Sequence, residues 1–331
     1  MLQLSFDPEK CLACESMSCL KKCIHLNYND ARIKEEIKKL ANGEYSSVLD
    51  DCTNCYGCEE NCPYDNHMFY RIVELQEKFD VRKVSDSVRE ELIKRYEPEG
   101  EFVPKSVGGK FVHICLFPHL KDLVYKGFFD GFEVVRGRHL FCNVVYLHYG
   151  MISVIKERIP VIIENMKKLE AEIFVFFHDE CYGFYNSLLR AYGVEVPFRY
   201  VHLFEYLRDF LKANSPKKLD IDVIYQRPCS NRLSPHIDKV VDEVFELIGV
   251  RRVNRYYDRD RALCCGASFV LSKEQDKVAY YRDKQKEDMF KFDTSWVIFN
   301  CPMCKSTLEG IVLDLGKKPL MLIELCKMAL E

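Results

Sequence analysis

The sequence predicts a helical α+β unit at the N-terminus followed by two α/β units. Three observations support this. Eight cysteines fall in two short runs within residues 11–62, apolar and amphipathic segments alternate from about residue 110 onward, and this alternating part contains an internal repeat. Alternating strand and helix patterns predict layered α/β structure with largely parallel sheets, and a repeat predicts a duplicated unit. We predict units at 1–100, 101–214 and 215–331.

Composition restricts the classes of function. The 331 residues, 48% of them hydrophobic, suffice for two or three packed units. A net charge of −3 argues against a nucleic-acid ligand, since that needs a basic face. No apolar run reaches membrane-spanning length, and the first residues lack a charged segment followed by an apolar one. We therefore expect a cytoplasmic chain with no membrane span, whose 17 cysteines cluster at metal-binding spacings rather than form a disulfide scaffold.

Within the first unit, the run Cys52-x2-Cys55-x2-Cys58-x3-Cys62-Pro63 resembles the cysteine run of bacterial ferredoxins. Zinc knuckles normally space their cysteine pairs further apart. An upstream run repeats this pattern with one wider gap, and Ile24 stands where proline usually follows. In a two-cluster ferredoxin the fourth cysteine of each run serves the other cluster. The resemblance thus implies two [4Fe-4S] clusters, one held by Cys11, Cys14, Cys19 and Cys62 and the other by Cys23, Cys52, Cys55 and Cys58.

Three amphipathic segments make the first unit more helical than a minimal ferredoxin. They lie at 30–40, closed by Asn42-Gly43, and at 68–78 and 85–96. Proline and glycine in Glu97-Pro98-Glu99-Gly100 end the last of them and mark the unit boundary.

The rest of the chain alternates apolar strand candidates with helix candidates. The strands are expected at 111–117, 172–177, 221–225 and 296–299, and the helices at 152–169, 201–212, 236–248 and 273–290. The apolar segment 320–330 reads as a further helix, with Cys326 as a core residue.

Five cysteines of the last unit form a distinctive series: Cys229, then the adjacent pair Cys264-Cys265 before Gly266, then Cys301 and Cys304. Neighbouring side chains in an extended segment point to opposite faces, so an adjacent pair suits a body larger than one ion. A glycine there lets the backbone approach such a body closely. Soft sulfur ligands favour iron–sulfur chemistry, while a four-cysteine zinc site and structural disulfides are the alternatives.

The internal repeat places a degenerate copy of this series in the middle unit. Cys115, Cys142 and Cys181 align with cysteines of the intact copy, whereas Asn143 and His178 replace two others. Three thiolates and an imidazole can form a closed zinc site, so Cys115, Cys142, His178 and Cys181 are candidate zinc ligands. The alternative is that these cysteines are small buried hydrophobes and that the site holds no metal.

The order C, CCG, CxxC resembles the cysteine-rich (CCG) domain of heterodisulfide reductase catalytic subunits. The resemblance implies a duplicated CCG domain pair behind a dicluster ferredoxin-like domain. It also implies an oxidoreductase of anaerobes, linked to methanogenesis, in which a noncubane [4Fe-4S] cluster performs thiol–disulfide chemistry. Its expected catalytic ligands are Cys229, Cys264, Cys265, Cys301 and Cys304. The expected partners are other redox subunits and a small thiol or disulfide substrate.

Two other functions remain open at this point. One is an electron relay or activation subunit of a larger redox complex, with no substrate of its own, and the other is a zinc-bearing scaffold. His178-Asp179-Glu180 could act as an acid–base cluster, although charged residues after a strand usually form a solvated loop. His113, His119 and His148 lie near the degenerate copy and could serve as ligands or proton donors; the alternative for each is a structural role.

Overall fold

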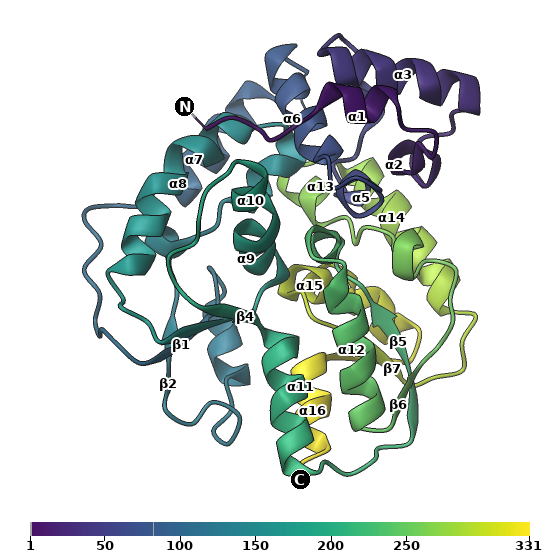
Figure 1. Cartoon of the computed structure of the whole chain (residues 1–331). Helices are drawn as coiled ribbons and strands as arrows, with labels where there is room; N and C mark the ends of the chain where they lie inside the picture. Colours follow the sequence, from purple (N-terminus) through teal and green to yellow (C-terminus); the bar gives the residue numbers. More distant parts are fainter. Residues whose placement is uncertain (1, 82) are drawn as a thin grey trace.

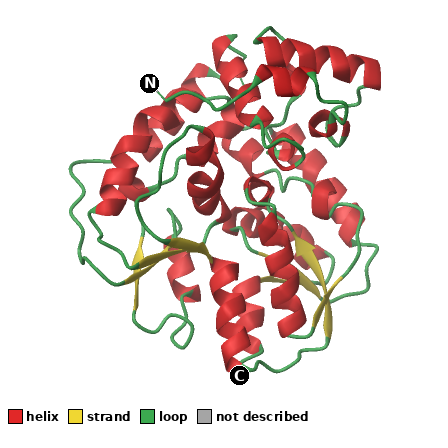
Figure 2. Cartoon of the chain, viewed as in Figure 1, coloured by secondary structure: helices red, strands yellow, loops and turns green. Residues whose placement is uncertain are grey.

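Two parallel sheets lie below a group of short helices in the computed structural model (Figure 1). The structure describes residues 2–81 and 83–331; Met1 and Arg82, both inside the predicted first unit, lie outside the described residues. Figure 2 shows the strands confined to the lower half of the view, where helices stand between and beside them, and helices and loops in the upper half. The chain is thus a mixed α/β structure with two small parallel sheets.

The described residues before Gly100 form helices and loops without a strand, so the α+β description of the first unit is wrong. Cysteine-bearing turns fill this segment and leave no alternating apolar run for a ladder. The longest helix of this segment, α3, begins after Asn29, whose side chain accepts from the Arg32 amide, and is capped by Gly43 with φ 73°. The helices are α1 (Pro8–Leu12), α2 (Ser18–Lys21), α3 (Asp30–Asn42), α4 (Val48–Asp51), α5 (Gly57–Glu60), α6 (Met68–Lys78) and α7 (Asp86–Tyr96).

The first sheet has the parallel order β2-β1-β3-β4. Its central strands are almost entirely buried, in agreement with their apolar sequences. The predicted strand 111–117 ends early, at His113, because the chain turns through Cys115 with φ 56°. The strands are β1 (Lys110–His113), β2 (Phe132–Val135), β3 (Ile173–Phe176) and β4 (Tyr200–His202).

The second sheet has the parallel order β6-β5-β7-β8, the same order of connection as the first. The predicted helix 320–330 is partly wrong, because its first residues pair with β7 and the helix starts only at Leu322. The strands are β5 (Ile221–Gln226), β6 (Val250–Arg252), β7 (Trp296–Phe299) and β8 (Lys318–Met321).

Helices cover and join the sheets. Between them, α11 (Leu203–Asn214) packs against α12 (His236–Leu247) (Figure 1). The other helices are α8 (Ile152–Lys167), α9 (Asp179–Gly183), α10 (Leu189–Ala191), α13 (Ala267–Leu271), α14 (Gln275–Met289), α15 (Pro302–Asp314) and α16 (Leu322–Met328). Short 3-10 helices lie at η1 (Pro118–Leu123), η2 (Arg138–Leu140), η3 (Val144–Tyr149), η5 (Cys229–Leu233) and η6 (Arg259–Arg261), and η4 (Phe184–Leu188) is a π-helical turn.

The segment η5 is the junction of the molecule. It contacts α9 from the middle unit and α5 from the first unit. A Cβ on Gly183 of α9 would lie 2.9 Å from the Leu233 side chain, so only glycine permits this approach. Cys229 therefore sits where all three predicted units meet.

Candidate metal centres

The first group of sulfurs joins the two runs of the first unit. The group consists of four thiols that lie close enough for the charge of one to raise the pKa of another: Cys11, Cys14, Cys19 and Cys62. Cys62 belongs to it although it is distant in sequence. Asn66 donates from its side chain to Cys11 Sγ at 3.1 Å and from its backbone amide to Cys62 Sγ at 3.3 Å. Such hydrogen bonds stabilise thiolate sulfur and tune a cluster bound to it.

The second group consists of Cys23, Cys52, Cys55 and Cys58. All four line one cavity, on whose wall Arg232 of the last unit also lies. Burial raises the pKa of Cys52 to about 12. Burial also acts on Cys55, but there the charge of His25, its hydrogen bond and the Arg232 guanidinium outweigh it and bring the pKa to about 6. A positive environment of this kind favours thiolate ligation.

Arg232 connects this second group to the last unit. Its side chain is only 3% exposed, and its guanidinium donates to the Cys55 carbonyl at 3.4 Å. The same group donates to the Ala262 carbonyl at 2.8 Å, directly before the Cys264 loop, and lies 3.3 Å from the Glu60 carboxylate. One buried cation thus contacts segments that carry cysteines of two different groups.

The third group gathers the five cysteines of the last unit. Cys264 interacts with both Cys229 and Cys265, and Cys304 interacts with both Cys265 and Cys301. The five sulfurs therefore form a chain of contacts across the ends of β5 and β7. Gly266, with φ 89°, turns the loop so that its amide donates to Cys264 Sγ at 3.3 Å.

The distances between these five sulfurs indicate which kind of metal centre they could bind. Among the described residues, the cysteine group whose sulfurs all lie within 4.8 Å of one another is Cys115, Cys142 and Cys181, not the five-cysteine group. A single tetrahedral ion needs its ligands closely gathered about one point. The chain of five sulfurs fits a larger iron–sulfur body better than it fits one zinc ion.

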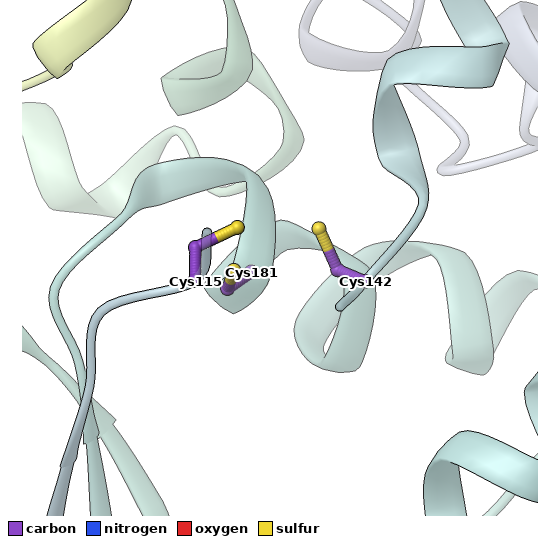
Figure 3. A group of neighbouring side chains, drawn as sticks. All are labelled: Cys115, Cys142 and Cys181. Atoms are coloured by element: carbon purple, nitrogen blue, oxygen red, sulfur yellow. The ribbon is translucent and has the colours of Figure 1, made fainter. Parts of the chain in front are cut away.

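The degenerate copy forms the fourth group. Figure 3 shows Cys115, Cys142 and Cys181 with their sulfurs turned toward a common space. All three are at least 99% buried, and they can offer three ligands to one ion. Asn143 does not replace the missing thiolate, because its side-chain oxygen accepts from Arg158 at 2.7 Å.

His178 lies between the third and fourth groups. Its Nε2 is 3.6 Å from Cys301 Sγ, and the same ring lies near enough to Cys115 to lower the pKa of that thiol. Its Nδ1 has no partner among the described residues. The imidazole thus faces sulfurs of both copies rather than belonging to one of them.

The remaining polar candidates have separate surroundings. Asp179 is buried and accepts from His202 at 3.2 Å, from Asn231 at 3.4 Å and from Asn300, so it joins loops of both sheets. This is a structural role rather than the solvated loop that its sequence context suggested. Glu180 lies 3.7 Å from His148 Nε2 and lines the central chamber described below.

Three further candidates from the sequence, His113, His119 and Cys326, make contacts outside the cysteine groups. The His113 ring packs edge-on against Phe176 and its Nε2 lies 3.1 Å from the Leu140 carbonyl, while His119 packs against Phe117. Cys326 is fully buried in α16, and burial raises its pKa well above its ordinary value. These contacts are those of structural residues.

A single chamber of about 190 Å³ connects the intact and degenerate copies. All five cysteines of the intact group line it, and so do Cys115, His148, His178 and Glu180. Part of the lining comes from the segments after β1, β3, β5 and β7, the carboxyl ends of the central strands of both sheets. Ligands of α/β proteins usually bind at such ends.

Sequence reasoning missed Arg232, His25, Asn66 and the structural role of Asp179. His25 follows Cys23 closely, and this proximity is a weak signal that it could reach a cluster. Arg232 carries no such signal, because it meets Cys55 only across 177 positions of sequence.

The comparisons with known proteins agree with this geometry. A family model described as a cysteine-rich domain (CCG) matches residues 223–309, a range that includes all five cysteines of the third group. Such domains occur in heterodisulfide reductase-like proteins. No curated protein matched the chain. In the described part of the chain, no helix combines the length and apolarity needed to cross a membrane. The chain therefore carries a CCG domain, and its gathered cysteines indicate metal or iron–sulfur binding.

Proposed function

We propose that the chain is an iron–sulfur oxidoreductase that carries electrons from two [4Fe-4S] clusters to a noncubane [4Fe-4S] centre, where a disulfide is reduced to thiols. Residues 1–100 would be the dicluster ferredoxin-like domain, and 101–214 and 215–331 the degenerate and intact CCG halves. The equal strand orders of the two sheets support the duplication. Other redox subunits would supply the electrons.

The observation that carries the proposal is the succession of sulfur groups. The group of Cys11 adjoins the group of Cys58, since the charge of the Cys19 thiolate raises the pKa of Cys58. The group of Cys55 adjoins the group of Cys229 through Arg232. The five-cysteine group then opens on the chamber. A relay without a substrate has no need of the chamber at its last centre.

The residues of the chain have defined tasks in this scheme. Cys11, Cys14, Cys19 and Cys62 would hold the outer cluster, and Cys23, Cys52, Cys55 and Cys58 the inner one. Cys229, Cys264, Cys265, Cys301 and Cys304 would hold the noncubane centre, which supplies one-electron redox chemistry next to substrate sulfur when bound. His178 lies beside Cys301, and apolar side chains such as Phe117 and Phe141 form part of the chamber wall.

A thiol-dependent paramagnetic signal tests the proposal. Anaerobic protein oxidised in the presence of a thiol should show such a signal, and Cys265→Ser should abolish it while both ferredoxin-type signals survive. Reduced viologen should support disulfide reduction by the wild type. If no thiol changes any signal, no disulfide is reduced and electrons pass only to a partner protein, the relay function replaces this proposal.

A further inference from the structure

A further set of possible metal ligands lies outside the cysteine groups. Glu59 of α5 and two residues of the loop before α6, Asp65 and His67, bring one ligand atom each within 4.8 Å of one another. The loop can place them there because only a short stretch of chain separates the two helices. Two carboxylates and one imidazole therefore lie around one point of the first unit.

Glu59 has a buried oxygen without a partner. Its side chain is only 6% exposed, and its Oε1 lies 2.7 Å from His67 Nδ1. Its Oε2 has no hydrogen-bond partner among the described residues. An unpaired buried polar atom is costly, and more so when its group is charged. A cation bound beside this carboxylate would remove that cost.

Asp65 supplies the third ligand from the surface. Its side chain is 57% exposed and forms an ion pair with Arg190 of α10, which is also exposed. An ion pair of this kind contributes little to stability, and a carboxylate has lone pairs left for a second partner. Because two carboxylates face one guanidinium, the group with a neutral His67 has a net negative charge, which favours a bound cation.

We infer that Glu59, Asp65 and His67 bind one divalent first-row transition-metal ion. These ions accept imidazole and carboxylate ligands, and the set contains no thiolate, which distinguishes it from the four cysteine groups. The ion would join α5 to the loop before α6. It would thereby fix Asn66, which lies between two of the ligands and donates to two sulfurs of the first cysteine group. This site is independent of the proposed disulfide chemistry.

Mn²⁺ is the probe, because this ion prefers oxygen and nitrogen ligands to the thiolates of the cysteine groups. The protein is full-length, loaded with iron and kept oxidised under anaerobic conditions. The electron paramagnetic resonance signal of free Mn²⁺ decreases as the ion binds, which gives the stoichiometry and the dissociation constant. The iron content shows whether each variant keeps its folded, loaded state.

Asp65 and Arg190 separate metal binding from a purely structural ion pair. Asp65→Asn removes the charge of a ligand and should weaken Mn²⁺ binding at least tenfold. Arg190→Gln removes a competing cation and should leave binding unchanged or tighten it by up to about fivefold. Both side chains are exposed, so neither substitution disturbs the core. His67→Gln should also weaken binding at least tenfold, whereas His236→Gln, which alters an exposed histidine 3.7 Å from Glu205, should have no effect.

The wild type should bind one Mn²⁺ per chain at this site. The inference is overturned if the wild type binds no Mn²⁺, if Asp65→Asn or iron-loaded His67→Gln loses less than tenfold in affinity, or if Arg190→Gln binds more weakly. An equal loss in His236→Gln also overturns it, because the ion would then lie elsewhere. Asp65→Asn decides alone if His67→Gln fails to keep its iron. None of these outcomes affects the proposed electron transfer, which disulfide reduction and the thiol-dependent signal test separately.

Discussion

Replacing Arg232 with glutamine should lower the reduction potential of the inner cluster. The guanidinium is buried beside Cys55, and the charge of Arg232 favours the Cys55 thiolate. A positive charge favours the more negative, reduced state of a neighbouring cluster, so its removal favours the oxidised state. Glutamine keeps a hydrogen-bond donor but no charge.

The size of the effect follows from Coulomb's law. A unit charge roughly 7 Å from the cluster centre, at an effective dielectric constant of about 20, contributes about 2.4 kcal/mol. The Glu60 carboxylate, 3.3 Å from Arg232, is present in both proteins and therefore does not reduce the difference between them. About 2.4 kcal/mol corresponds to roughly 100 mV for a one-electron couple. We expect a shift of that size, toward lower potential.

An anaerobic redox titration followed by electron paramagnetic resonance measures this shift. Arg227→Gln is the matched control, because Arg227 is also buried and lies 2.7 Å from Glu60 but bonds Asn231 and the Arg259 carbonyl rather than Cys55. Arg232→Lys, which keeps the charge, should shift the potential by less than half as much. An unchanged inner-cluster potential in iron-loaded Arg232→Gln, or an equal shift in Arg227→Gln, would refute the electrostatic role.

Two further predictions concern the middle unit. Cys181→Ala should remove one bound metal ion per chain and lower the melting temperature by about 4–8 °C, as the loss of roughly 2 kcal/mol implies. The spectrum of the five-cysteine centre should not change, and Cys326→Ala is the control. Wild-type stability and metal content in Cys181→Ala would show that Cys115, Cys142 and Cys181 are only core residues. Asp179→Ala should lower the free energy of unfolding by about 3–5 kcal/mol, because it leaves the buried donors of His202, Asn231 and Asn300 without their acceptor. A loss below about 1 kcal/mol in thermal or denaturant unfolding would contradict the role of Asp179 in joining the loops of the two sheets.

The sequence predicted the buried centres of the sheets better than their edges. Trp296–Phe299 was located without error, since a short apolar run between turn signals is typical of a central strand. The edge strand Val250–Arg252 was missed, because a three-residue strand with two arginines carries no such pattern. Local periodicity likewise gave α6, Met68–Lys78, with its observed bounds.

The candidate sites divide in the same way. The short spacing of Cys52, Cys55 and Cys58 was enough to predict that they lie together, because few residues separate them in the sequence. The position of His178 between two sulfur groups depends on how the two sheets face each other. No local pattern could predict that arrangement, and the same holds for the contact of Arg232 with Cys55.

Metal analysis of anaerobically purified protein, combined with electron paramagnetic resonance, tests the central claim most directly. With all three proposed clusters in place, each chain should carry about twelve irons, roughly four per cluster, and the reduced protein should show two ferredoxin-type signals. A count near eight irons with one or two zinc ions would contradict the account, because it would leave Cys229, Cys264, Cys265, Cys301 and Cys304 without the cluster on which the proposed chemistry depends.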